Sequence, residues 1–258
     1  MEIILTEKYS IIKVRLQQNI AIAILLFPVA SDAQRTTQHT NMFWAGYYNT
    51  IRLSSKWSIA SDAQLRTTDW TDKWSQLLVR SGLAYSFNKN FSLTGGFAFF
   101  KNAKYADKEL LLKNEWRPWQ ELFYQLPLHK IYLVQRLRTE QRFLQEVVNN
   151  KKINSYQYVF RLRYKFEWQF PLQENNIRLL IGNEIMINPG YINTKLFFDQ
   201  NRTSSGINFK LNSVTNLQCQ YIKIFQWHSN TSVLEDQNVF RVNIFQQFNL
   251  KNKKAKQS

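Results

Sequence analysis

The segment from Tyr156 to Phe170 has a large apolar side chain at every second position. Most residues between them are polar or charged, with Val159 the exception. Steps of two residues would scatter the apolar groups around a helix, whereas a strand puts them all on one face. At roughly 3.3 Å per residue the segment could span about 50 Å, more than the ~9–11 tilted residues of a membrane strand require. The pattern predicts one wall strand of a transmembrane β-barrel, with aromatic residues toward lipid and charged residues toward the lumen.

Segments with this period recur from about Met42 to Leu250. We predict strands at 42–53, 57–67, 74–87, 91–100, 114–126, 130–143, 156–170, 176–188, 204–212, 215–227 and 237–250. Bacterial single-chain barrels have an even number of strands. We therefore expect an all-β, antiparallel transmembrane β-barrel of 12 strands, with 10 as the alternative, and an arginine-rich polar lumen. A missing strand could lie within 189–203.

The connections between these segments alternate in length. Short ones fall at 54–56, 88–90, 127–129, 171–175 and 212–214, and long ones near 68–73, 101–113, 144–155, 189–203 and 228–236. Outer-membrane barrels have short periplasmic turns and longer outer loops. We therefore expect the short connections on the periplasmic side and the long ones on the outer side. Trp57, Trp74, Trp168 and Trp227 lie at segment ends, where an interfacial aromatic girdle is expected and ordinary packing is the alternative.

The N-terminus resembles a secretory signal peptide. Lys8, Lys13 and Arg15 precede an apolar stretch at 20–30, and Ser31-Asp32-Ala33 suits cleavage. We therefore predict a signal peptide at 1–33, a barrel at 34–250 and a basic tail at 251–258, located in the outer membrane of a diderm bacterium. The tail is expected to be solvated, with contact to an anionic polymer or lipid head group as the alternative.

The amino-acid composition limits the classes of partner that the protein is expected to bind. The formal net charge is +16, but the basic residues alternate with aromatic ones inside strands, so a nucleic-acid partner is not expected. The single cysteine, Cys219, excludes an intrachain disulfide and a thiolate metal cluster. We expect a monomer in contact with membrane lipid, with anionic solutes or envelope polymers as candidate partners and no cofactor.

Charged residues gather on the polar faces of the four central segments. This predicted lumen ladder comprises Arg117, Glu121, Arg136, Arg138, Glu140, Arg142, Arg161, Arg163, Lys165, Glu167, Arg178 and Glu184, and Glu115 shares the face of Arg117. Opposite charges on adjacent strands stabilise pairing, and arginine pairs bidentately with carboxylates. One interpretation is a structural plug of salt bridges. The other is a narrow pore lining that favours anions, because basic residues outnumber acidic ones.

Two further charged residues, Asp199 and Arg202, are expected in a loop that could bind a ligand or fold into the mouth of the barrel. Ordinary loop chemistry is the alternative explanation, and we favour it.

The ladder resembles a known family. Glu115-Trp116-Arg117-Pro118-Trp119-Gln120, the run from Gln135 to Phe143, Arg161-Leu162-Arg163-Tyr164, Asn183-Glu184 and the run from Phe198 to Arg202 follow in its order, as does Arg80 to Tyr85 earlier. These motifs resemble the uncharacterised outer-membrane β-barrel proteins grouped as domain of unknown function 2490, over roughly residues 44 to 250. The resemblance implies an outer-membrane barrel and brings no established activity.

Signals for catalysis are weak. A serine hydrolase needs a histidine beside its serine, yet His228 and Ser229 are consecutive and would point to opposite faces of a strand. His39 lies near the predicted mature N-terminus and His129 in a turn. Glu140 and Glu184 could serve as an acid/base pair, but their arginine neighbours favour ionised salt bridges. We expect no enzymatic activity.

Overall fold

The computed structural model describes residues 37–106, 109–172, 176–190, 197–227 and 234–250. The chain divides into two compact units, Met1–Arg35 and Thr36–Ser258, and every described residue belongs to the second. The predicted signal peptide and basic tail lie outside the described residues and stay predictions.

Eleven strands form from the described residues, one at each predicted segment. They are β1 (Thr37–Arg52), β2 (Trp57–Thr68), β3 (Lys73–Ser86), β4 (Phe91–Ala106), β5 (Glu109–Leu128), β6 (Ile131–Val148), β7 (Lys151–Leu172), β8 (Ile177–Ile187), β9 (Phe198–Lys210), β10 (Thr215–Trp227) and β11 (Leu234–Asn249). No described helix is both long and apolar enough to cross a lipid bilayer.

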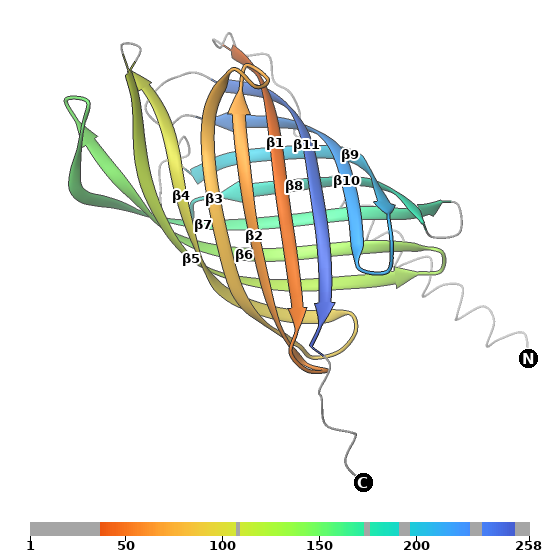
Figure 1. The fold of residues 1–258 in the computed structure, drawn as a ribbon. Helices are drawn as coiled ribbons and strands as arrows, with labels where there is room; N and C mark the ends of the chain where they lie inside the picture. The colour runs from red at the N-terminus through yellow and green to blue at the C-terminus, as the bar shows by residue number, and fades with distance from the viewer. Residues whose placement is uncertain (1–36, 107–108, 173–175, 191–196, 228–233, 251–258) are drawn as a thin grey trace, which may run out of the picture. The chain divides into compact units, whose positions relative to one another are not determined.

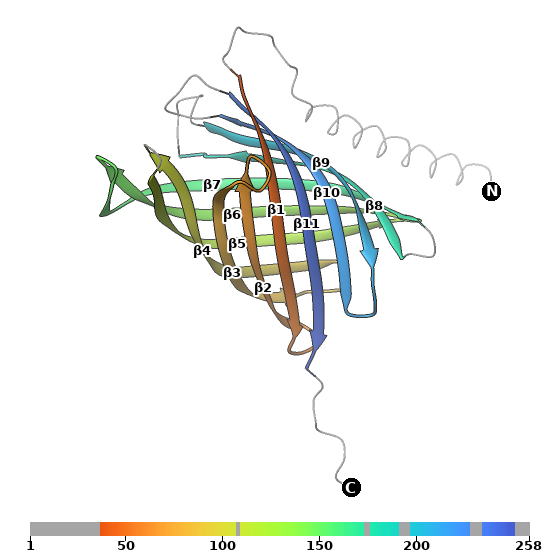
Figure 2. The same ribbon diagram turned by 45° about the horizontal axis from the view of Figure 1, so that its top comes forward.

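The strands close into a barrel in sequence order (Figures 1 and 2). Each strand pairs antiparallel with its sequence neighbour, and β1 closes the ring by pairing in parallel with β11, from Thr37 opposite Leu234 to Arg52 opposite Asn249. An odd number of alternating strands leaves the first and last pointing the same way, so only a parallel pair can close the ring. Within the described part of the chain, neither twelve nor ten strands is confirmed. Because β8 pairs directly with β9, the 189–203 stretch adds no strand between them.

The predicted long connection at 144–155 is wrong. β6 runs to Val148, β7 starts at Lys151, and only Asn149 and Asn150 turn between them, both with positive φ as a tight hairpin requires. The two strands continue as a hairpin that projects from the barrel (Figure 1). We call the end with this turn and the β2–β3 turn the upper end, and the end where β1 turns into β2 the lower end.

Asp199 and Arg202 do not lie in a loop, because β9 already begins at Phe198. The first residues of this strand, which was predicted to start at 204, were missed because both of its faces are polar here. On the outer face, Asn201 and Thr203 hydrogen-bond to Asn183 of β8 instead of presenting apolar groups. Without an apolar face the segment has no visible period of two.

Two apolar clusters lie inside the barrel, where a polar lining was expected. One comprises Met42, Trp44, Ile222, Ile224 and Val239, and the other Leu78, Ala98, Phe100 and Trp119. Both consist of inward-facing residues that are nearly inaccessible to solvent. The barrel interior therefore combines apolar packing, mostly on the β1–β4 and β10–β11 side, with charged groups that are most numerous on β5–β9.

Candidate functional site

The pairing register brings the predicted lumen ladder together on one interior wall. Glu121 of β5 lies opposite Arg138 of β6, which lies opposite Arg163 of β7. Two arginines directly opposite each other would repel. Carboxylates remove this repulsion, because Arg138 donates to Glu121 at 2.7 Å and Arg163 has carboxylate partners of its own.

Glu140 is the centre of the wall. Its side chain accepts from Arg163 at 2.7 Å and from Arg117 at 2.9 Å. The guanidinium groups of Arg161 and Arg138 lie at 3.8 and 3.9 Å. Glu140 is only 1% exposed. Four guanidinium groups around one buried carboxylate keep it ionised, so Glu140 acts as a structural counter-ion.

Three more carboxylates repeat this arrangement. Glu115 accepts from Arg117 and Arg142, each with a shortest contact of 2.6 Å. Glu184 accepts from Arg136 at 2.6 Å and from Arg163 at 2.8 Å. The third, Glu121, lies 3.6 Å from Arg136 in addition to its bond with Arg138. A further pair, Lys165 and Glu167, is closed at 2.7 Å.

Asp199 reaches the same interior through an irregularity of β9. The register shifts between Met186 and Ile187 of β8, whose partners are Gln200 and Phe198, so Asp199 is an extra residue without a direct partner. Such a bulge re-aims a side chain. The carboxylate of Asp199 lies 2.8 Å from Arg161 of β7.

Arg178 is the ladder residue that does not join this network among the described residues. Its guanidinium lies over the ring of Tyr132, 5.6 Å from the centroid, toward the lower end of the barrel.

Three more interior arginines were not assigned to the ladder from the sequence. Arg80 pairs with Asp62 at 2.6 Å, and Arg66 lies over the indole of Trp44 at 4.0 Å. Arg202 lies over the same indole at 5.1 Å. The signal for Arg66 was present, because it is on the polar face of the alternation that starts at Trp57.

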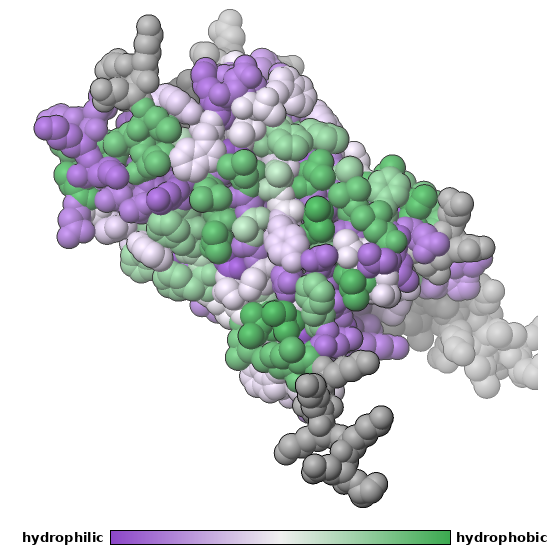
Figure 3. All heavy atoms as spheres, viewed as in Figure 1, coloured by the Kyte–Doolittle hydropathy of each residue, from purple (hydrophilic) through white to green (hydrophobic). Residues whose placement is uncertain are grey.

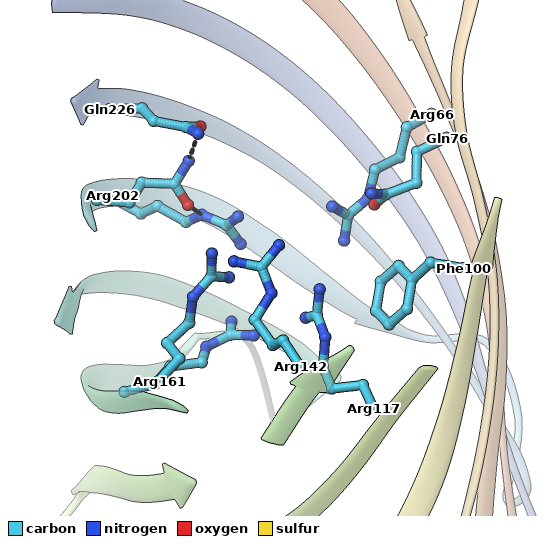
Figure 4. Close-up of a pocket in the computed structure, with 10 residues that line it drawn as sticks. Arg66, Gln76, Phe100, Arg117, Arg142, Arg161, Arg202 and Gln226 are labelled. Carbon is cyan, nitrogen blue, oxygen red and sulfur yellow. Dashed lines mark hydrogen bonds between the residues drawn. The ribbon is translucent and has the colours of Figure 1, made fainter. Parts of the chain in front are cut away.

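A cavity of about 140 Å³ lies between the charged wall and Arg66. Six of the ten residues that line it are arginines, namely Arg66, Arg117, Arg142, Arg161, Arg163 and Arg202. Three are glutamines and one is Phe100. Figure 4 shows the arginines of β5, β6, β7 and β9 reaching toward a space that Arg66 enters from the facing wall.

The two described histidines that were weighed for catalysis lie at opposite ends of the barrel. His39 Nδ1 lies 3.1 Å from Asp236 Oδ2 at the upper end, and His129 is in a lower turn. His228 and Ser229 lie outside the described residues. Within the described ranges, no group of three or more His, Cys, Asp or Glu residues suits a metal ion.

One comparison with known proteins matches most of the barrel sequence. A family model described as "Protein of unknown function (DUF2490)" matches residues 41–235. No curated protein matches the chain. Among solved structures, the beta domain of the Bordetella autotransporter Brka is similar with a TM-score of 0.48 and 8% sequence identity, over 75% of this chain and 84% of that chain.

Proposed function

Since the chain belongs to the DUF2490 family of proteins of unknown function, we propose its role from its own structure: a non-catalytic outer-membrane β-barrel with an interior closed by side chains. It serves the envelope of a diderm bacterium as a structural barrel with an interaction role, and its partners are membrane lipid and anionic groups.

The outer wall supports contact with lipid. Each of the eleven strands exposes at least one large apolar residue on its outward face: Tyr47, Leu65, Val79, Phe97, Leu122, Leu137, Tyr158, Ile181, Ile207, Tyr221 and Phe240. In Figure 3 hydrophobic residues cover much of the visible wall, and hydrophilic residues gather at the upper end. Soluble monomers rarely expose apolar surface on this scale, whereas barrels in lipid require it.

A row of aromatic rings near the lower end supports the same location. Trp57 contacts Tyr85 at 4.9 Å between centroids, Tyr85 contacts Phe87 at 5.0 Å, and Phe87 contacts Phe91 at 5.1 Å. Aromatic girdles mark the membrane–water interface of such barrels. Trp57 is thus the predicted girdle residue that the structure favours most.

The observation that carries the proposal is the closed interior. The inward-facing residues Met186, Ile224 and Val239 are 0% exposed. Residues that line an aqueous channel are wetted. The dry packing of these inward-facing residues supports a closed barrel over an open porin.

Planar-bilayer recording tests the proposal. The purified protein, shown to be folded by heat-modifiable migration in electrophoresis, should insert without stepwise conductance. Steps with an anion preference would refute closure and establish the alternative, a narrow anion-favouring channel. In such a channel Arg138→Ala and Arg163→Ala should change the ion selectivity. Cell fractionation tests the location, and recovery with soluble proteins would refute it.

The alternative, a narrow anion-favouring channel, has one observation in its favour. This is the arginine-lined cavity, because basic linings favour anion passage.

The proposal of a non-catalytic protein has its own test. A lipase assay on the wild type and Ser229→Ala should give no activity in either, and hydrolysis lost in Ser229→Ala would refute it.

A further inference from the structure

We propose that the cavity beside Arg66 and Arg202 is a binding site for a multivalent oxyanion, phosphate or a phosphoryl group. The proposed closed barrel does not require such a site, and a silent bilayer would leave the inference untouched.

The first argument is the charge around the cavity. Among the described residues, eight guanidinium groups meet five carboxylates around the cavity and in the part of the charged wall behind it. They are Arg66, Arg117, Arg136, Arg138, Arg142, Arg161, Arg163 and Arg202, against Glu115, Glu121, Glu140, Glu184 and Asp199. A buried charge is costly unless it is paired. The excess of three positive charges matches an anion that carries two or more negative charges.

The second argument is where this excess lies. Arg163 uses Nε, Nη1 and Nη2 on Glu140 and Glu184, and Arg117 likewise uses all three nitrogens on carboxylates. Arg202 has one carboxylate neighbour, Glu184, and that is 3.9 Å away. For Arg66, no carboxylate in the described ranges lies within salt-bridge distance. The unpaired charge is therefore concentrated at Arg66 and Arg202.

The third argument is that two hydrogen-bond donors at the cavity have no acceptor. Nε of Arg66 and Nε of Arg161 are buried without a hydrogen-bond partner among the described residues. Buried guanidinium donors normally find acceptors. Both side chains line the cavity, where an oxyanion would supply the missing acceptors.

The fourth argument is that the least-paired arginines are held in place. The indole of Trp44 lies under both Arg66 and Arg202, and cation–π contact of this kind stabilises a guanidinium without neutralising it. Gln200 accepts from Arg202 Nε at 2.7 Å and donates to Gln226 at 2.6 Å. Figure 4 shows Arg202 and Gln226, the two ends of this series of hydrogen bonds, beside the cavity. Such positioning leaves the outer nitrogens of Arg202 free to bind a ligand.

Chemistry and size then identify the ligand class. No carboxylate lines the cavity among the described residues, and its six arginines would repel a cation. Planar guanidinium forks match the oxygens of phosphate in bidentate pairs. A volume of about 140 Å³ admits a small oxyanion with a few waters, given roughly 30 Å³ per water.

Titration calorimetry on the barrel folded in nonionic detergent tests the site, with inorganic phosphate as the probe at constant chloride. We expect one phosphate per barrel. Affinity should fall at least about tenfold in Arg66→Gln and in Arg202→Gln, since each removes a charge-assisted contact. Gln200→Ala, which keeps every arginine, should weaken binding by misplacing Arg202 and serves as the second variant if an arginine variant fails to fold.

Arg178→Gln is the matched control, because Arg178 also faces inward but does not line the cavity. Absence of phosphate binding to the folded wild type would overturn the inference, as would an equal loss in Arg178→Gln. Glycerol phosphate distinguishes the source of the ligand. Binding of inorganic phosphate alone assigns a free ion, and binding of both assigns a phosphoryl group of a larger molecule.

Discussion

Arg163 Nη1 donates to Glu140 Oε1 at 2.7 Å across the β6–β7 pair, with both side chains buried inside the barrel. The same guanidinium also donates to Glu184 of β8, so Arg163 links the ion pairs of Glu140 to those of Glu184. Three strands are thus tied together through one side chain.

Removing the charge of Glu140 should destabilise the barrel strongly. Glu140→Gln leaves Arg117, Arg138, Arg161 and Arg163 with a neutral group at their centre. Breaking a buried charge cluster by removing one partner costs about 3–5 kcal/mol. Urea unfolding of the barrel in lipid vesicles, followed by tryptophan fluorescence, measures the change in the free energy of unfolding.

Glu146→Gln is the control on the same strand, because no salt bridge to Glu146 occurs within the described residues. It should change the free energy of unfolding by less than about 0.5 kcal/mol. Equal effects of the two substitutions would mean that the ion network does not stabilise the fold.

Gly96→Ala should also destabilise the barrel. A Cβ there would overlap the carbonyl oxygen of Ser81 and lie 2.6 Å from Gly82 Cα and 2.8 Å from Trp119 Cζ2. Overpacking of this kind costs about 1–3 kcal/mol. At the neighbouring Gly95, on the outer face, a Cβ would have no other atom within 4 Å, so Gly95→Ala should be tolerated. A thermal melt monitored by heat-modifiable migration compares the two, and similar midpoints would contradict the close approach.

Paired cysteines can test the parallel closure. In a Cys219→Ser background, Ala45→Cys with Val242→Cys should form a disulfide on oxidation, because Ala45 and Val242 are register partners. Ala45→Cys with Asn238→Cys should not. Four residues along the strand correspond to roughly 13 Å, beyond the ~7 Å limit for a disulfide. Non-reducing electrophoresis gives the result, and a disulfide in the second pair alone would refute this register.

Trp44→Ala should open the interior. Trp44 packs with Ile222, Ile224 and Val239 inside the barrel, and loss of a buried aromatic side chain leaves a cavity and costs about 3–5 kcal/mol. The variant should admit small ions in a vesicle-leakage assay. Trp116→Ala removes an indole from the outer face instead and should not. Equal leakage of the two variants would show that Trp44 does not help to close the barrel.

Much of the fold could be predicted because alternation is local. Wherever one face is apolar and the other polar, as in β2 and β7, the sequence identified the strand and its outward side. β9 shows the limit of this reasoning, because Asn201 and Thr203 make its outer face polar and its first residues read as a loop. The hairpin turn at Asn149 and Asn150 was missed for a similar reason, since polar strand ends resemble connections.

The sequence by itself determined the all-β class, the position of the eleven strands and the inward side of the arginine ladder, because a period of two follows from strand geometry alone. Tertiary structure decided which residues face each other across the interior. Closure through parallel β1 and β11 depends on the direction in which the last strand meets the first. Trp44, Arg66 and Arg202 come from β1, β2 and β9, and only the closed ring brings them together. Whether each arginine has a carboxylate partner depends on that same register, which no local pattern encodes.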